Sequence, residues 1–143
     1  MSYLLDTNVV SEWVRPRPAA AVVAWLAQAN EDELFLSVCT LAELHFGVAA
    51  MPKGRRRNHL EDWLRNDLVA RFDGRIVPVD LLTAAAWGEI SAAAKRKGRP
   101  IDVMDGLIAA TAEVHDMTVV TRNSTDFQAV GVPLFNPWES RTT

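Results

Sequence analysis

Four acidic side chains in this sequence have the residue types and positions that metal-assisted chemistry requires: Asp6, Glu43, Asp105 and Asp126. Each lies beside a short apolar run that predicts a β-strand, or near the start of a segment that predicts a helix. Two unit charges about 4 Å apart repel by about 4 kcal/mol at an effective dielectric constant near 20. Carboxylates held that close need protons or a cation, and oxygen ligands without histidine or cysteine favour Mg²⁺ or Mn²⁺ over Zn²⁺. Hydrolysis of phosphodiester bonds is the chemistry that such a site supports.

Helix capping is the alternative role for three of these acids. The spacing of a capping box occurs at Thr40 to Glu43, Asp102 to Asp105 and Asn123 to Asp126. A carboxylate in the first turn also interacts favourably with the helix dipole, by about 0.3–1 kcal/mol. Taken singly, each segment fits a cap, and we interpret Asp102 as an N-cap. Asp6 fits this explanation less well, because it ends a predicted buried strand.

Alternating strands and helices must position these acids. Apolar runs predict strands at residues 2–6, 34–37, 75–79 and 118–121, with a fifth at 134–135. Helical spacing and breakers predict helices at residues 7–13, 19–30, 40–50, 55–72, 82–97, 102–115 and 125–130. This order is typical of an α/β fold, with a central parallel sheet of four or five short strands and helices on both faces, here in one domain over residues 1–143. Ligands of such sheets bind at the carboxyl ends of the strands, where Asp6, Glu43 and Asp126 fall.

Several apolar residues are candidates for the core. Two helix faces are predicted to contact it: Val23, Leu26 and Ala27, and the stripe Leu60, Trp63, Leu64 and Leu68. We interpret Trp13, Trp25 and Trp63 as core residues, although they would also suit a partner surface. Cys39 is interpreted as a small core residue, and the three histidines, which lack metal-ligand spacing, as surface or packing residues.

The composition excludes two classes of protein. Hydrophobic residues make up 49% and charged residues 23% of the 143 residues, as in an ordinary globular chain. Cys39 is the single cysteine, so a disulfide-stabilised scaffold is excluded and a reducing cytoplasm is the expected compartment. No uncharged apolar run approaches the ~18 residues of a membrane span, and Asp6 interrupts the first apolar run where a signal peptide would continue. We expect no membrane association.

The net charge of −3 at first disfavours a nucleic-acid partner. That objection loses force if the acids gather in one metal site while the basic residues lie elsewhere. Two basic clusters occur, at residues 53–57 (KGRRR) and 95–99 (KRKGR). Both suit solvated helix ends or loops, and whether either contacts a nucleic acid stays open.

Four segments together resemble the motifs of PIN-domain nucleases. They are Leu4-Leu-Asp-Thr-Asn-Val9, Thr40-Leu-Ala-Glu-Leu-His-Phe-Gly47, Asp105-Gly-Leu-Ile-Ala-Ala-Thr-Ala112 and Thr121-Arg-Asn-Ser-Thr-Asp-Phe127. They occur in the order expected for the family, and the resemblance, which spans nearly the whole chain, is closest to the VapC-type toxins of type II toxin–antitoxin pairs. It implies a three-layer PIN-like domain and a Mg²⁺- or Mn²⁺-dependent endoribonuclease.

The resemblance also implies roles for individual residues. Asp6, Glu43 and Asp105 match the three core acids and Asp126 the fourth, with Asp6 and Asp105 expected to contact the metal directly. Glu43 and Asp126 are expected to bind through water or to orient the attacking water. The supporting polar positions fall on Thr7, Thr121 and Asn123. The resemblance further implies an RNA substrate, a homodimer, and inhibition by a cognate antitoxin protein, with DNA bound only indirectly through that antitoxin.

Two other functions compete with this interpretation. A phosphatase with an aspartyl nucleophile requires a second aspartate two residues after Asp6, where this chain has Asn8. A non-catalytic RNA- or protein-binding module on the same fold is the other alternative. The presence of all four acids argues against it, because a degenerate site has no reason to keep carboxylates that repel one another.

Overall fold

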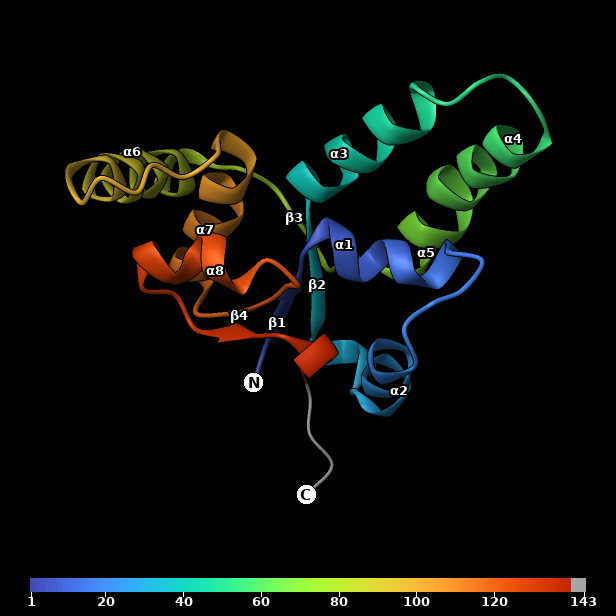
Figure 1. Ribbon diagram of the computed structural model, residues 1–143, viewed down its shortest axis with the longest axis horizontal. Helices are drawn as coiled ribbons and strands as arrows, with labels where there is room; N and C mark the ends of the chain where they lie inside the picture. The colour runs from blue at the N-terminus through green and yellow to red at the C-terminus, as the bar shows by residue number, and fades with distance from the viewer. Residues whose placement is uncertain (140–143) are drawn as a thin grey trace.

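A five-stranded parallel sheet forms the centre of the computed structural model, which describes residues 1–139 (Figure 1). The strands are β1 (Tyr3–Leu5), β2 (Leu34–Ser37), β3 (Ile76–Val77), β4 (Thr118–Val120) and β5 (Leu134–Phe135). Their order is β3-β2-β1-β4-β5, so β1 is central, with Tyr3 opposite Leu34 of β2 on one side and Thr118 of β4 on the other. The predicted parallel sheet, including its fifth strand, is confirmed.

Helical segments connect successive strands in the predicted order. The α-helices are α1 (Thr7–Val10), α2 (Ala20–Gln28), α3 (Val38–Ala49), α4 (Arg55–Asp62), α5 (Val69–Arg71), α6 (Leu81–Arg96), α7 (Val103–His115) and α8 (Ser124–Phe127). Short 3-10 helices are η1 (Ser11–Val14), η2 (Glu31–Glu33), η4 (Gln128–Val130) and η5 (Pro137–Glu139). The predicted helix at residues 55–72 consists of α4, a π-helical stretch η3 (Trp63–Leu68) and α5.

The two faces of the sheet bury different apolar residues, because successive strand residues point to opposite faces. Leu5 and Val120 belong to a cluster with side chains of α1, α2, α3, α4 and η3. Leu4 and Val119 belong to a second cluster with side chains of α7 and α8. Figure 1 shows α6, α7 and α8 on one side of the sheet and α1 to α5 on the other. The three-layer architecture is therefore the one expected.

The predicted core residues are mostly buried, but the buried face of one helix, α2, was predicted incorrectly. Leu60, Leu64 and Leu68 are buried, and Trp63 packs partly buried against them. In α2, however, Leu26 and Val22 are buried whereas Val23 is 40% exposed and Ala27 is exposed as well. Helical spacing alone allows a face centred on either valine, and the predicted face containing Val23 is wrong.

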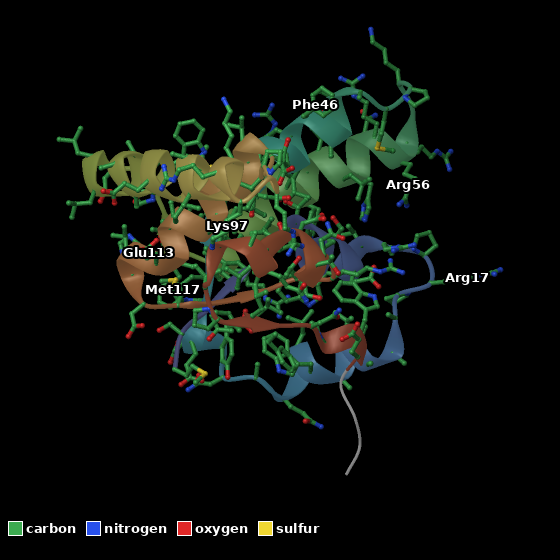
Figure 2. All side chains as sticks on the ribbon, turned by 60° about the vertical axis from the view of Figure 1, so that its left-hand side comes forward. Arg17, Phe46, Arg56, Lys97, Glu113 and Met117 are labelled. Carbon is green, nitrogen blue, oxygen red and sulfur yellow. The ribbon has the colours of Figure 1, made fainter. Side chains whose placement is uncertain are left out.

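The remaining core interpretations agree with the structure. Trp13 and Trp25 pack partly buried against the first cluster, as does Trp63, and Trp25 contacts Tyr3 with ring centroids 5.3 Å apart. Cys39 is buried, and the three histidines are exposed. Phe46 of α3 is 76% exposed, on the same side of the molecule as Arg56 of α4 (Figure 2). Along residues 1–139, no helix is both long and apolar enough to cross a membrane.

Candidate active site

Asp6 occupies the carboxyl end of the central strand and is almost fully buried, with 3% of its surface exposed. Its backbone N–H donates to the Val120 carbonyl at 2.9 Å, so the ladder between β1 and β4 fixes its position. Oδ1 accepts from the Thr7 N–H at 2.8 Å, and Oδ2 accepts from Thr121 Oγ1 at 2.8 Å. Burial raises the pKa of Asp6, against the opposing effect of these hydrogen bonds. Asp6 is thus a carboxylate in a fixed orientation beside β4.

Glu43 lies in α3, one turn and a half after β2, and is linked to β1 through a hydroxyl. Thr7 Oγ1 donates to Glu43 Oε1 at 2.6 Å. Thr7 therefore contacts Asp6 with its N–H and Glu43 with its side chain. Because the pKa of Asp6 is raised by the charge of Glu43, the two carboxylates are near enough to repel each other.

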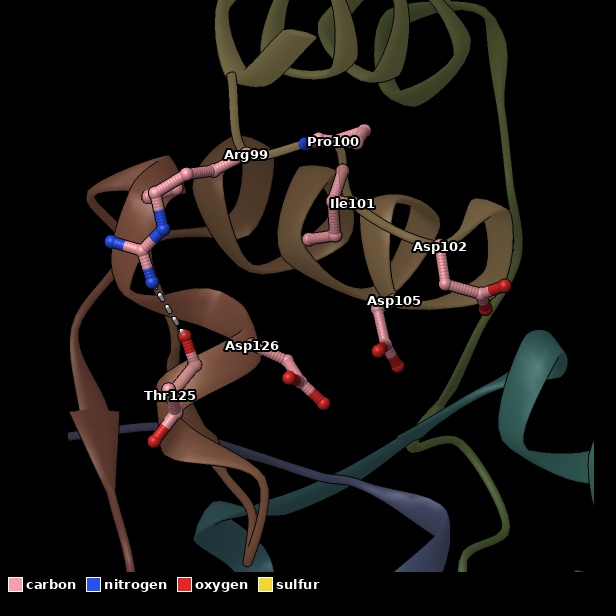
Figure 3. Close-up of a pocket in the computed structure, with 8 residues that line it drawn as sticks. Arg99, Pro100, Ile101, Asp102, Asp105, Thr125 and Asp126 are labelled. Carbon is pink, nitrogen blue, oxygen red and sulfur yellow. Dashed lines mark hydrogen bonds between the residues drawn. The ribbon is translucent and has the colours of Figure 1, made fainter. Parts of the chain in front are cut away.

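Asp105 lies in the first turn of α7. Burial raises its pKa to about 7, and four neighbouring carboxylates, those of Asp6, Asp102, Glu43 and Asp126, add to the shift. The charges of acids predicted from separate segments thus all act on Asp105. Figure 3 shows the carboxylates of Asp105 and Asp126 directed toward the same space, whereas Asp102 points elsewhere.

Asp126 is the exposed member of the group, and it lies in α8 after β4. Thr121 leads from β4 toward it, and its Oγ1 accepts from the Asn123 N–H at 3.0 Å. The same hydroxyl donates to Asp6, so it joins Asp6 to the turn that carries Asn123 and Asp126. Thr121 is fully buried. Each predicted supporting residue is thus in contact with this turn or with the acids.

The capping alternatives have different outcomes. Asp102 is the N-cap of α7, accepting from the Met104 N–H at 3.2 Å, as predicted. The predicted box from Thr40 to Glu43 is wrong: Ser37 caps α3 through the Cys39 N–H, and Thr40 Oγ1 donates to the Leu5 carbonyl at 3.4 Å.

The third predicted capping box is also wrong. Asn123 makes no side-chain cap to α8, and the Asp126 N–H donates to the Asn123 backbone carbonyl at 3.0 Å. The carboxylates of Glu43 and Asp126 are therefore free of the reciprocal capping bonds that would have explained them as fold-stabilising residues.

Asn8 was not recognised from the sequence as part of the site. Its Nδ2 donates to Asp6 Oδ2 at 3.4 Å, and its Oδ1 accepts from the Arg122 N–H at 3.1 Å. The sequence signal that could have identified Asn8 is its position two residues after Asp6, where its amide can link the ends of β1 and β4. Glu12 is a second buried acid, but it pairs with Arg15 at 3.2 Å and accepts from the Ala19 N–H, so it stabilises the start of α2.

The acids lack cationic partners. In the described part of the chain, the ion pairs are Met1 with Glu33, Arg15 with Glu12, and Arg71 with Glu31. Nor do any three His, Cys, Asp or Glu side chains among residues 1–139 lie close enough together to hold an ion as they stand. Mg²⁺ and Mn²⁺ sites tolerate such an open arrangement, since Mg²⁺ keeps several waters and uses one or two carboxylates together with substrate oxygens. The all-oxygen donor set around Asp105 fits such an ion.

Comparison with known proteins places this geometry in a family. A family model described as the PIN domain matches residues 3–133. The chain belongs to the PIN-domain family. The PIN-domain protein is 45% identical to the toxin FitB of Neisseria gonorrhoeae, in an alignment covering 94% of this chain and 97% of FitB. It is 42% identical to the VapC ribonuclease Y4jK of Sinorhizobium fredii, over 95% of this chain and 97% of the relative.

A solved structure of FitAB bound to an IR36 DNA fragment contains a PIN-domain chain that superposes with a TM-score of 0.92. The identity is 43%, and the match covers 98% of both chains. The sheet order and the helices of this PIN domain are therefore those of the family.

Replacing Thr121 by valine tests the link between β4 and Asp6. The variant keeps the side-chain shape but removes the hydroxyl, so Asp6 Oδ2 keeps only the 3.4 Å bond from Asn8 Nδ2 and the Asn123 N–H loses its acceptor. We expect a loss of about 1–3 kcal/mol in the free energy of unfolding and a drop of about 10–100-fold in any metal-dependent cleavage. Thr83→Val is the matched control, because buried Thr83 donates to Asp80 at the start of α6. Equal cleavage by the two variants, per folded molecule, would contradict a role for Thr121 in orienting Asp6.

Proposed function

We propose that this protein is a metal-dependent endoribonuclease that hydrolyses RNA phosphodiester bonds and acts as the toxin of a toxin–antitoxin pair. The observation that carries the proposal is the grouping of four acids at the carboxyl edge of the sheet: Thr7 links Asp6 to Glu43, and Asp105 and Asp126 line one pocket. The raised pKa of Asp105, about 7, agrees with this grouping. The relative named a VapC ribonuclease supports RNA as the polymer. Unpaired oxygen ligands support Mg²⁺ or Mn²⁺ as the cofactor.

Each residue of the site has a distinct role in this proposal. Asp6 and Asp105 hold the ion, and a bound Mg²⁺ or Mn²⁺ supplies positive charge for the transition state and lowers the pKa of a water. Glu43 accepts a proton from the attacking water or orients it, with Thr7 Oγ1 fixing the position of its carboxylate. Asp126, being exposed, faces the incoming substrate and orients water. Thr121, Asn123 and Asn8 keep Asp6 and the turn after β4 in register.

Metal removal tests the proposal. With Mg²⁺, we expect purified protein to cut a total-RNA pool at discrete positions, because phosphate oxygens complete the coordination that the carboxylates begin. Excess EDTA is expected to stop cleavage, and addition of Mn²⁺ beyond the EDTA concentration to restore it. The measurement is mapping of the new RNA ends by primer extension. No cleavage in any lane, or cleavage that persists in EDTA, would contradict a metal-dependent nuclease.

An antitoxin protein is the proposed partner. A hollow of about 280 Å³ between α1, α3, α4 and η3 is lined by Leu44, Val48, Leu60 and Trp63 and reaches Thr7 and Glu43. An antitoxin segment bound there would make apolar contacts with the hollow and would block access to Glu43 at its edge. The solved structure of FitAB bound to a DNA fragment supports such a partner. Contact of this protein with DNA only through that partner is part of the proposal.

Two finer properties complete the proposal. We place the protein in the cytoplasm, where its RNA substrate is found and where Cys39 stays reduced. A homodimer is proposed because large apolar side chains remain exposed at the start of α6, with Leu81 90% and Leu82 68% exposed.

A further inference from the structure

A hollow of about 420 Å³ opens beside two of the acids and is separate from the apolar hollow near α3 (Figure 3). We call it the Arg99 pocket. Its lining is formed by Arg99, Pro100, Ile101, Asp102, Asp105, Thr125, Asp126 and Ala129. Pockets of about 300–1,000 Å³ accommodate small organic ligands, so this one has room for a single nucleotide unit.

The loop between α6 and α7 fixes the position of the Arg99 side chain. Gly98 has φ of +71°, which turns the chain at the end of α6, and the Arg99 N–H donates to the Ala94 carbonyl at 3.0 Å. Lys97 Nζ donates to the Ala129 carbonyl at 3.1 Å, which ties the same loop to η4. Arg99 Nη2 donates to the Thr125 carbonyl at 3.4 Å, as the dashed line in Figure 3 shows. The guanidinium is thus held across the pocket toward α8.

Arg99 retains most of its binding capacity. A guanidinium has five N–H donors, and the hydrogen bond to Thr125 uses one. The described residues contain no carboxylate within 4 Å of Arg99, even though Asp105 and Asp126 line the same pocket. The same pocket therefore presents an unpaired cation from the loop after α6 and unpaired carboxylates from α7 and α8. A ligand that satisfies both must bring anionic oxygens for Arg99 and, through a metal ion, anionic oxygens for the carboxylates.

RNA supplies anionic oxygens at two such places, since each nucleotide unit lies between two phosphates. We propose that the Arg99 pocket holds the nucleotide adjacent to the scissile phosphate, with Arg99 bound to the neighbouring phosphate of the strand. The apolar side chains of Pro100, Ile101 and Ala129 contact the sugar and base. A base can enter only when it is unstacked, so the substrate is single-stranded at this position. The inference rests on the proposed function for the identity of the polymer.

The proposal also divides the basic cluster at residues 95–99. Arg99 lines the pocket, and Lys97 anchors the loop. Arg96 is exposed at the last residue of α6 and does not line the pocket, although it carries the same charge three positions away. Arg96 is therefore a matched control for Arg99.

Binding of RNA is the direct test. The full chain carrying Asp105→Asn, which prevents cleavage, is titrated into a fluorescein-labelled, single-stranded 8-nucleotide RNA of random sequence, and anisotropy is followed at several salt concentrations. Adding Arg99→Ala is expected to weaken binding about 5–10-fold and to reduce the slope of log K against log salt by about 0.7, as loss of one phosphate contact does. Adding Arg96→Ala is expected to weaken binding less than about 2-fold.

A second variant tests the volume of the pocket rather than its charge. Ala129→Leu fills part of the hollow and is expected to weaken binding at every salt concentration while leaving the salt slope unchanged. Equal losses for Arg99→Ala and Arg96→Ala, unchanged binding by Ala129→Leu, or no detectable binding by the protein with Arg99 intact would each overturn the proposal. If these binding results are as expected but the wild-type chain cleaves no RNA, the pocket stands as an RNA subsite and the proposed nuclease activity fails.

Discussion

Asp105→Asn is expected to abolish RNA cleavage, by about 10²–10³-fold or more, while making the metal-free protein more stable near pH 8. The carboxamide occupies the same place in the first turn of α7 but carries no charge to hold the cation. Cleavage of RNA with saturating Mg²⁺ measures the first effect. Asp102→Asn is the matched control, since asparagine also caps helices and the Asp102 carboxylate caps α7 and points away from those of Asp105 and Asp126 (Figure 3). It should retain cleavage within about 3-fold, and a similar loss in both variants would contradict a specific role for Asp105.

The stability that Asp105→Asn gains over wild type is expected to increase as the pH rises from 4 to 8. The pKa of Asp105 is about 7 in the folded protein, raised above its ordinary value of 3.8. The folded state therefore binds this proton more tightly than the unfolded state, so stability from this group is present below about pH 4 and is lost as the pH rises through 7. Wild type and Asp105→Asn should have similar melting temperatures at pH 4. At pH 8 the variant should be more stable by about 1 kcal/mol, or roughly 3–6 °C, because partial exposure of Asp105 screens its interactions.

Mg²⁺ should reverse this order at pH 8. An ion that binds the folded protein raises its melting temperature, and only the wild type keeps both carboxylates for it. A constant difference between the two proteins from pH 4 to pH 8, with or without Mg²⁺, would show that Asp105 does not titrate near neutrality and does not hold the ion.

Gly106→Ala is expected to destabilise the protein and to lower cleavage about 10²-fold, although the substituted residue carries no functional group. A Cβ at Gly106 would lie 2.9 Å from Trp87 Nε1, 3.0 Å from Trp87 Cδ1 and 3.3 Å from Ser91 Oγ, all on α6. Relieving this overlap requires the Trp87 side chain to shift or α7 to move away from α6, at a cost of about 1–3 kcal/mol. Asp105 is the preceding residue, and a displacement of about 1 Å is enough to reduce catalysis to that extent.

Gly88→Ala in α6 is the control for this prediction. A Cβ at Gly88 meets nothing within 4 Å, so the variant should gain about 0.5–1 kcal/mol from helix propensity. Thermal unfolding followed by circular dichroism should thus shift in opposite directions for the two alanine variants. If Gly106→Ala melts at or above the wild-type temperature with full cleavage, the contact between α6 and α7 does not position Asp105.

The strands and the acids could be predicted from the sequence because their signals are local. Apolar runs such as Leu4 and Leu5 before Asp6 identify a buried strand and its carboxyl end without knowledge of any partner. Parallel topology then brings the ends of β1, β2 and β4 to one edge. The expected convergence of Asp6, Glu43 and Asp126 follows from this rule, whereas Asp105, in the helix before β4, is assigned to the group by the family resemblance.

The details that were wrong depend on contacts between distant segments. Thr40 was predicted to cap α3, but its hydroxyl donates to the Leu5 carbonyl, 35 positions away, and Ser37 provides the cap. Val22 rather than Val23 is buried because the packing of α2 against η1 and η5 selects the face. Likewise, the clash that makes Gly106 necessary arises from Trp87 on another helix. Local spacing cannot distinguish these alternatives, because each satisfies the same helical period.

The placement of β4 beside β1 has a consequence for the timing of activity during synthesis. The hydroxyl that holds Asp6 belongs to Thr121, 115 positions later in the chain, and the last acid follows it at Asp126. A ribosome that has translated only the first hundred residues has synthesised β1, β2 and β3 but neither α7 nor β4. Because such long-range pairing forms late in folding, the nascent chain has no complete site. A nuclease built in this order stays inert toward the ribosome and the message that are producing it until translation of the domain is nearly finished.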